Sequence, residues 1–225
     1  MKALPHPTAI LWDWDNTLVD GWSAIAAGLN AAFDAFALPR WTVDEVKARV
    51  RHSLRESFPP IFGAEWERAR DIFYAAVQAS HLAVLTPMPG AEAALLAARA
   101  VAPQGVVSNK QGALLRAEAA HLGWTHFFHA LVGAGDAVAD KPAAAPLLLA
   151  LQGCGVPAGP AVWYVGDTSL DMQAARSAGC SAVLLGDASH DGGAAQAAPD
   201  ATFTDGHTLS AHLASLAKPP PPGGV

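Results

Sequence analysis

The sequence is poor in cysteine. Of its 225 residues only Cys154 and Cys180 are cysteines, and they form neither a CxxC pair nor the spacing of a metal site. We therefore expect reduced thiols in a cytoplasmic protein and no disulfide framework. The N-terminal apolar run is short and ends at Asp13, so we also expect no signal peptide.

Basic residues are scarce as well. Fourteen lysines and arginines stand against 20 acidic residues, which gives a net charge of -6. This balance argues against a nucleic-acid-binding surface and against a polybasic membrane anchor. Residues 142–166 carry no charge, but prolines and glycines divide them into short pieces, so no membrane span is predicted. Any anionic ligand must be held by local groups.

What the sequence does contain is typical of a globular protein. Hydrophobic residues make up 52% of it, and many of them are alanines, which suit tightly packed helices. A chain of 225 residues is longer than one average domain and shorter than two. It can bury a sizeable core. We expect one core domain with a smaller insert.

The most informative stretch is a short apolar run that ends in acid. Residues 8–12 have the length and residue types of a buried strand, and Asp13 and Asp15 follow at once. In a strand, residues i and i+2 point to the same side. Two carboxylates about 4 Å apart repel by roughly 4 kcal/mol at an effective dielectric constant of about 20, so both stay ionised only beside a cation. A metal ion is the simplest such cation.

The segment after this strand is helical. Apolar spacing predicts helices at residues 22–37, 43 to about 52, and 65 to about 80, with no strand between them. Thr42 followed by Glu45 is a capping-box pattern, and the proline-containing run 85–90 is typical of a hinge. The predicted domains are an α/β core from residues 1–20 and 86–216, a helical segment from 21–85, and a disordered tail from 217–225.

The rest of the chain alternates between helices and strands. Pro142 suits the first turn of a helix that ends before Gly153, and residues 187–200 are typical of a loop. The expected strands are residues 105–107, 131–132, 161–165, 181–185 and 201–203, with helices between them and a last helix that ends near residue 216. This alternation predicts an α/β fold with a doubly wound parallel sheet and a small all-helical domain.

Polar residues recur where the predicted strands end. Ser108 and Asn109 follow the second strand, and Asp167 and Asp171 follow the fourth. The carboxyl ends of the strands of an open parallel sheet face a common crevice, where ligands bind. These groups can therefore converge with Asp13.

Four motifs carry a resemblance to a known family. They are Asp13-Trp14-Asp15-Asn16-Thr17-Leu18, Val106-Val107-Ser108-Asn109-Lys110, Asp140-Lys141-Pro142 and Val165-Gly166-Asp167-Thr168-Ser169-Leu170-Asp171. In this order they resemble the signatures of the haloacid dehalogenase superfamily, and within it the phosphoglycolate-phosphatase-like hydrolases with a helical, C1-type cap. The resemblance covers residues 9 to about 185, and the helices between Asp20 and Leu85 match the position of the family's cap.

The resemblance implies a Mg²⁺-dependent phosphatase that acts on a small phosphorylated metabolite. Asp13 would attack phosphorus and become a phosphoaspartate. Asp15 would protonate the leaving oxygen and then deprotonate the attacking water, work that contributes roughly 10²- to 10⁴-fold. The side chains of Asp13 and Asp167 and the backbone carbonyl of Asp15 would hold Mg²⁺. Asp171 would bind the ion directly or orient its ligands.

The same resemblance implies how phosphate is held. The Ser108 hydroxyl and the Asn109 backbone N–H would bind phosphate oxygens, and Lys141 would neutralise the charge of the transferring group. Asn16 stands where the family commonly has glycine, and we expect the turn to form because Asn tolerates unusual backbone angles. The dehalogenase branch lacks the second acid, so Asp15 favours phosphate ester hydrolysis over carbon–halogen cleavage.

Two other functions stay open at this stage. A sugar phosphomutase shares both acids and all four motifs. A catalytically silent module that binds Mg²⁺ and an anion would have lost the nucleophile or the acid, and neither is lost here. No oligomeric state is predicted.

Simpler interpretations exist for several residues. Asp167 and Asp171 could cap the following helix, Ser108-Asn109 could be a helix cap, and Lys141 could be a surface lysine. Other residues are more simply structural. A basic cluster in the helical segment is more simply explained as a solvated helix face than as a binding site for an anionic substrate. His126 and His129 are more simply explained as structural residues. Ser189-His190-Asp191 is typical of a loop, because neighbours in sequence cannot adopt the geometry of a catalytic triad. The cluster consists of Arg49, Arg51, His52 and Arg55.

Overall fold

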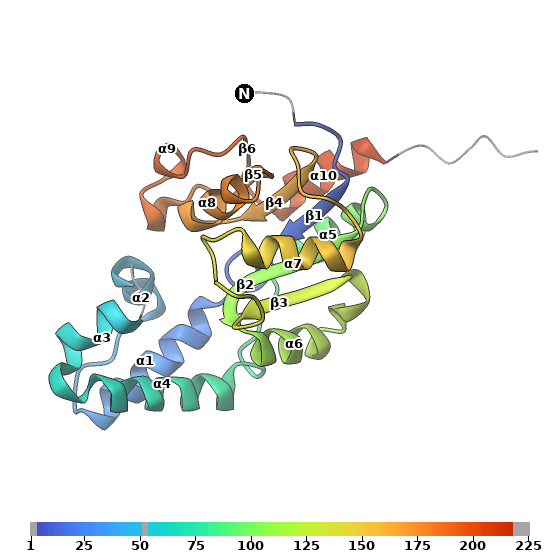
Figure 1. Cartoon of the computed structure of the whole chain (residues 1–225). Helices are drawn as coiled ribbons and strands as arrows, with labels where there is room; N and C mark the ends of the chain where they lie inside the picture. Colours follow the sequence, from blue (N-terminus) through green and yellow to red (C-terminus); the bar gives the residue numbers. More distant parts are fainter. Residues whose placement is uncertain (1–3, 51–53, 218–225) are drawn as a thin grey trace, which may run out of the picture. The chain divides into compact units, whose positions relative to one another are not determined.

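The computed structural model describes residues 4–50 and 54–217 and divides them between two compact units (Figure 1). One unit runs to Leu18 and resumes at Pro87, and the other spans Val19–Thr86. The chain therefore leaves the first unit once and returns to it once.

The first unit is built on a six-stranded, all-parallel sheet. Its strands are β1 (Ala9–Trp12), β2 (Gln104–Gln111), β3 (Ala130–Ala134), β4 (Val162–Gly166), β5 (Ser181–Leu185) and β6 (Ala201–Phe203). They lie in the order β3-β2-β1-β4-β5-β6. The strand order reverses beside β1, and the carboxyl ends of β1, β2 and β4 meet there, where ligands bind in folds of this kind. The predicted α/β fold is confirmed.

Helices cover both faces of this sheet (Figure 1). They are α5 (Ala91–Arg99), α6 (Gly112–His121), α7 (Ala145–Cys154), α8 (Ser169–Ser177), α9 (Ala194–Ala197) and α10 (Gly206–Leu216). Right-handed crossovers put α5 and α6 on one face and α7 and α8 on the other. Buried side chains of α7 and α8, such as Leu147 and Met172, pack with the strand residues Leu11 and Tyr164 in one core.

The central strand β1 anchors the residues that follow it. All four residues of β1 are buried, and it pairs on both sides, so that Trp12 lies opposite Val106 of β2 and Val165 of β4. Trp12 Nε1 donates to Gln104 Oε1 at 2.9 Å, which satisfies its buried N–H. The residues that follow β1 are therefore anchored from both sides.

The second unit is helical, as the absence of strand patterns predicts. Its helices are α1 (Trp22–Ala35), α2 (Val43–Arg49), α3 (Leu54–Phe62) and α4 (Trp66–Ser80). Thr42 and Glu45 form the predicted capping box at the start of α2. Helices α1 and α4 pack closely because Gly28 has no side chain; a Cβ there would lie 2.7 Å from atoms of Phe73 and Val77.

Helix α3 was not expected from the sequence. Pro59 and Pro60 lie inside it, and proline normally interrupts a helix. Burial of Phe58 and Phe62, whose rings lie 5.0 Å apart, favours the helix despite the prolines. The predicted end of the preceding helix near residue 52 lies outside the described residues, as does the predicted tail from residue 218 onward.

Two further local expectations are wrong. Pro142 does not begin a helix: it follows a cis peptide bond in a turn, and α7 starts at Ala145 with Pro146 in its first turn. The segment 187–200, expected as a loop, contains the 3₁₀ turn Ser189–Asp191 and the short helix α9. Such short elements lack the apolar periodicity on which prediction depends.

Candidate active site

Three carboxylates meet at the carboxyl ends of β1 and β4. Asp13 follows β1, Asp167 follows β4, and Asp171 lies in the first turn of α8. Each offers an oxygen within 4.8 Å of those of the other two, and all three residues are buried. The in-register pairing of Trp12 with Val165 brings the first two residues together. A Cβ at Gly166 would collide with the Asp171 side chain, so the cluster requires glycine there.

Among the residues that the structure describes, one lysine reaches this cluster. Lys141 Nζ donates to Asp13 Oδ1 at 2.6 Å and to Asp171 Oδ1 at 2.7 Å, and its side chain is only 4% exposed. Burial acts to lower the pKa of Lys141, but the carboxylates of Asp13 and Asp171 outweigh it and hold that pKa well above its usual value. Lys141 is therefore a buried cation and not a surface lysine.

One ammonium does not balance three carboxylates. Burial raises the pKa of Asp13 well above its usual value; Lys141 opposes the rise, and Asp171 and Asp167 add to it. Burial also raises the pKa of Asp167. Asp167 Oδ2 lies 3.3 Å from His190 Nε2 but accepts no hydrogen bond in the described part of the chain. An all-oxygen donor set with an excess of negative charge fits a hard divalent cation such as Mg²⁺.

Asp171 is held from several directions. Its Oδ2 accepts hydrogen bonds from the Thr168 backbone N–H at 3.1 Å and the Thr168 hydroxyl at 2.6 Å, so it caps α8. Its Oδ1 accepts from Lys141 and from the Tyr164 hydroxyl, the latter at 3.2 Å. Capping and membership of the cluster coexist in this residue.

Asp15 lies apart from these three side chains. Strand β1 ends at Trp12, so strand alternation does not set the direction of Asp15. Its carboxylate is 27% exposed and accepts from Lys110 Nζ at 2.7 Å. Burial of the group raises the pKa of Asp15, and Lys110 opposes this rise. The two acids of the first motif therefore contact different lysines, Asp13 with Lys141 and Asp15 with Lys110.

The end of β2 holds the third motif in place. Asn109 Nδ2 donates to the Lys141 carbonyl at 3.1 Å, and the Lys141 backbone N–H donates to Asn109 Oδ1 at 3.0 Å. Ser108 is buried, and its Oγ accepts from the Lys110 backbone N–H at 3.2 Å. The Asn109 side chain therefore fixes the backbone of Lys141, a contact between residues 32 apart that no local pattern signals.

Sequence reasoning missed other groups around the cluster. Thr17 Oγ1 donates to Asp167 Oδ1 at 3.2 Å, and His190 lies beside the other oxygen of the same carboxylate. Asp191 Oδ2 accepts from the Ser169 backbone N–H at 2.6 Å, so His190 and Asp191 have different partners and form no triad. The position of His190 just after β5, at the edge where the other site residues lie, could have signalled its contact.

The remaining candidates stay outside this cluster. His126 Nδ1 bonds the Gly123 carbonyl at 2.7 Å, as a structural histidine would. In the helical unit, Arg49 pairs with Glu45 and lies 4.7 Å from the centre of the Trp41 ring. The other members of the basic cluster, Arg51, His52 and the Arg55 side chain, lie outside what the structure describes.

Comparison with known proteins decides the family. Residues 10–185 match the model of the haloacid dehalogenase-like hydrolases. The chain belongs to the haloacid dehalogenase-like hydrolases. The resemblance predicted from the four motifs is therefore confirmed, and with it the prediction of a hydrolase.

Relatives of this haloacid dehalogenase-like hydrolase carry a common name. A phosphoglycolate phosphatase from Chromobacterium violaceum is 31% identical over 194 residues, which cover 81% of this chain and 86% of that protein. A phosphoglycolate phosphatase from Xylella fastidiosa is 31% identical over 212 residues and covers 91% and 92%. The names of both relatives describe phosphoric monoester hydrolases, the enzyme class expected from the sequence.

Solved structures share the fold. A haloacid dehalogenase-like hydrolase from Streptococcus pneumoniae has a TM-score of 0.79 at 22% identity, covering 92% of this chain and 98% of that one. A structure from Haemophilus somnus, described as a predicted phosphoglycolate phosphatase, has a TM-score of 0.77 at 22% identity, covering 91% of this chain and 97% of that one.

No helix in the described part of this chain combines the length and apolar character that a bilayer span requires.

The haloacid dehalogenase-like turn after β1 forms despite its unusual residue. Asn16, where the family commonly has glycine, lies at a φ of +62°, in the left-handed region that Asn adopts more readily than most residues. The Leu18 backbone N–H donates to the Trp14 carbonyl at 2.9 Å and closes the turn. The expectation that this turn survives is confirmed.

Proposed function

We propose that this protein is a Mg²⁺-dependent phosphatase that hydrolyses a small phosphorylated metabolite through a phosphoaspartate. The observation that carries the proposal is the buried group of Asp13, Asp167 and Asp171, whose three carboxylates are contacted by the single ammonium of Lys141, at Asp13 and Asp171, and by His190, at 3.3 Å from Asp167. A buried excess of carboxylates is costly unless a cation compensates it. The names of the relatives support the same reaction class.

Asp13 is the nucleophile in this proposal. One of its oxygens forms a bond to phosphorus as the ester P–O bond breaks, and the leaving oxygen takes a proton from Asp15. In the second half, water gives a proton to Asp15 and attacks phosphorus, and the bond from phosphorus to Asp13 breaks. Asp15 ends the cycle protonated, as it began.

Positive and polar groups hold the phosphoryl group. Lys141, already 2.6 Å from Asp13, neutralises the charge that gathers on the transferring group. The Ser108 hydroxyl and the Asn109 backbone N–H bind phosphate oxygens. Because Asn109 also pairs with the backbone of Lys141, one residue positions both the anion-binding N–H and the lysine.

Three groups hold the ion in this proposal: the side chains of Asp13 and Asp167 and the backbone carbonyl of Asp15. When bound, Mg²⁺ supplies the positive charge that lets a phosphate approach these carboxylates. Asp171 has hydrogen bonds on both oxygens, so it orients the Lys141 ammonium and acts on the ion indirectly. His190, beside Asp167, supports that ligand from outside.

Substrate size and choice belong to the helical unit in this proposal. Residues 21–85 act as the cap domain, and movement at hinges near residues 20–21 and 85–90 excludes water and then admits it. The relatives' names make phosphoglycolate the first substrate to test.

We further propose a cytoplasmic enzyme, in keeping with its unpaired cysteines.

Phosphate release from 4-nitrophenyl phosphate tests the proposed function. We expect turnover that needs Mg²⁺, disappears with EDTA and falls by at least about 10³-fold in Asp13→Asn, because that change removes the nucleophile. Asp71→Asn makes the same chemical change at an exposed ion pair of the helical unit and should turn over normally. Undiminished turnover by Asp13→Asn would refute the proposal.

A panel of phosphorylated metabolites then addresses the substrate. We expect inorganic phosphate as the product from phosphoglycolate or from a sugar phosphate. An isomerised sugar phosphate formed without free phosphate would instead identify a phosphomutase.

A further inference from the structure

A fully buried carboxylate lies outside the cluster of three. Glu118 of α6 has a side chain that is 1% exposed. Its Oε2 accepts from Trp14 Nε1 at 2.6 Å, and both its oxygens accept from Lys110 Nζ, at 2.8 Å and 2.7 Å. Buried ion pairs contribute little to stability and often cost it. A role other than stability is therefore the better explanation for this pair.

Lys110 connects this carboxylate to the proposed acid–base residue. Its Nζ also donates to Asp15 Oδ1 at 2.7 Å, and its side chain is 10% exposed. An ammonium has three N–H donors, and three carboxylate oxygens lie within 2.8 Å of this one. All three short contacts of the ammonium go to carboxylates, so the geometry connects Lys110 to the reaction through Asp15.

The far end of this chain of contacts is rigid. The Trp14 ring is fully buried and meets the rings of Trp124 and Phe128 edge to face, with centroids 6.1 and 6.4 Å away. Trp14 therefore fixes Glu118, which in turn fixes Lys110. Asp15 itself is 27% exposed and follows the end of β1, so strand alternation does not set the direction of its side chain.

We propose that Lys110 and Glu118 form a positioning pair that directs the Asp15 carboxylate toward the leaving oxygen and the attacking water. The inference rests on the proposed phosphatase function and assigns to this pair a role in it. Proton transfer requires the base within about 2.6–3.2 Å of its proton, and a misplacement of about 1 Å can cost on the order of 10²-fold in rate. In this proposal Lys141 interacts with the nucleophile Asp13, and Lys110 orients the acid–base residue Asp15.

The experiment uses Lys110→Met/Glu118→Gln. Changing the lysine alone would leave Glu118 buried without its cation, whereas in the double variant the new amide oxygen can still accept from Trp14. The matched control is Arg116→Met/Asp136→Asn, which removes an exposed ion pair whose arginine lies on the same helix α6. Thermal unfolding checks that both variants fold.

The readout separates the two half-reactions. The nitrophenolate of 4-nitrophenyl phosphate leaves without a proton, but water activation in the second half still needs Asp15. We expect kcat to fall about 10²-fold in the double variant, kcat/KM to stay within about threefold, and a stoichiometric burst of nitrophenolate to precede slow turnover. The control should show wild-type kinetics.

Two results would overturn the inference: an unchanged kcat, or an equal fall of kcat and kcat/KM with no burst, which a merely structural role would produce. If the double variant does not fold, the test uses Glu118→Gln alone, which keeps Lys110. A burst of nitrophenolate followed by an about tenfold lower kcat would support the inference. Wild-type kinetics of this variant would oppose it. A wild type that releases no phosphate from any substrate refutes the proposed function itself.

Discussion

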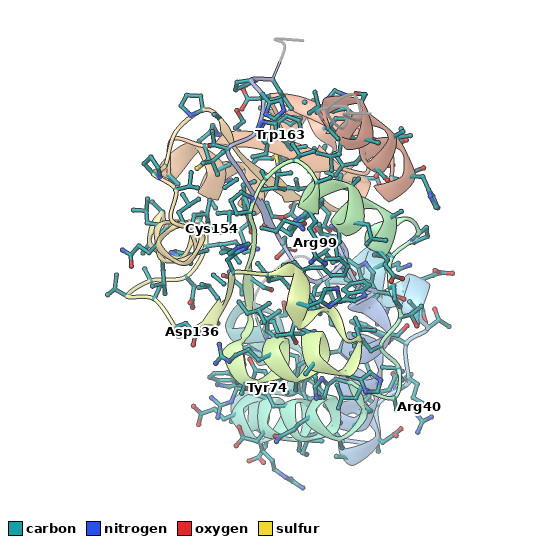
Figure 2. All side chains as sticks on the ribbon, turned by 90° about the vertical axis from the view of Figure 1, so that its right-hand side faces the viewer. Arg40, Tyr74, Arg99, Asp136, Cys154 and Trp163 are labelled. Atoms are coloured by element: carbon teal, nitrogen blue, oxygen red, sulfur yellow. The ribbon has the colours of Figure 1, made fainter. Side chains whose placement is uncertain are left out.

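The two units of this protein use charged residues in opposite ways. In the helical unit the described ion pairs lie in solvent: in the Arg40–Asp34 pair the side chains are 69% and 47% exposed, and Arg40 extends outward from the ribbon (Figure 2). At the carboxyl ends of the strands, Lys141 and Lys110 are buried against carboxylates. Exposed pairs contribute little to stability, and buried pairs are often costly. The buried pairs therefore mark the proposed active site.

The hydrophobic cores of the two units also differ in the side chains that fill them. Rings of Phe33, Phe58, Phe62 and Phe73 pack against one another in the helical unit, with centroids 5.0 to 5.8 Å apart along the series. The core shared by α7, α8 and the sheet is mostly alanine, leucine and valine. Aromatic packing stabilises the helical unit, whereas the sheet of the other unit positions buried carboxylates and lysines at the carboxyl ends of its strands.

The largest expected effect is at a buried pair. Lys141→Met leaves Asp13 and Asp171 buried without their cation, so we expect a loss of about 3–5 kcal/mol in the free energy of unfolding of the metal-free protein. We also expect phosphatase turnover to fall by at least about 10²-fold. Urea unfolding in EDTA and kinetics in Mg²⁺ measure the two effects. If Lys141→Met kept both the stability and the turnover of the wild type, the buried pairs would matter no more than the exposed pairs of the helical unit.

An aromatic change tests the other half of the comparison. Phe58→Ala should lower the free energy of unfolding by about 3–5 kcal/mol, because it opens a cavity among the rings of the helical unit. Tyr74→Ala, at a 39% exposed position on α4 (Figure 2), is the control and should cost much less. Equal effects in urea unfolding would show that ring burial does not hold this unit together.

A metal-binding measurement sharpens the comparison further. Asp167→Asn should weaken Mg²⁺ binding by about 10- to 100-fold in calorimetric titration, since it removes a proposed ligand. The protein should also lose the rise in unfolding temperature that Mg²⁺ gives the wild type. Asp71→Asn should leave both unchanged. Equal affinity in wild type and Asp167→Asn would place the ion elsewhere.

The smallest effect is expected at an exposed pair of the α/β unit. The Arg116 guanidinium holds the pKa of Asp136 below its usual value, with burial opposing it and the Gly133 N–H adding to it. A lowered pKa contributes stability above the unfolded-state pKa of about 3.9, and this stability is lost as the pH falls through the folded-state value. Asp136→Asn should therefore cost at most about 1 kcal/mol at pH 7, and less as the pH drops below about 4. Urea unfolding at several pH values measures this difference; a cost that grows in acid would contradict it.

Local patterns predicted much of the fold. The alternation of apolar strands with helices predicted all six strands, and the Thr42 and Glu45 spacing predicted a capping box, because each depends on residues close in sequence. Helix α3 was missed because Pro59 and Pro60 argue against a helix locally, while ring packing with distant residues favours one. The start of α7 was misplaced because Pro142 suits a first turn, a place that Pro146 takes instead.

The sequence by itself determined the family, the parallel sheet and most of the residues that gather at its carboxyl edge, because three of the four motifs are short runs that include or directly follow the end of a strand. Only the tertiary structure decided which lysine serves which acid: Lys141 reaches Asp13 across 128 residues, and Lys110 reaches Asp15 across 95. Such pairings depend on the order in which strands lie side by side. Because β2 and β4 flank β1, loops far apart in the sequence meet around Asp13.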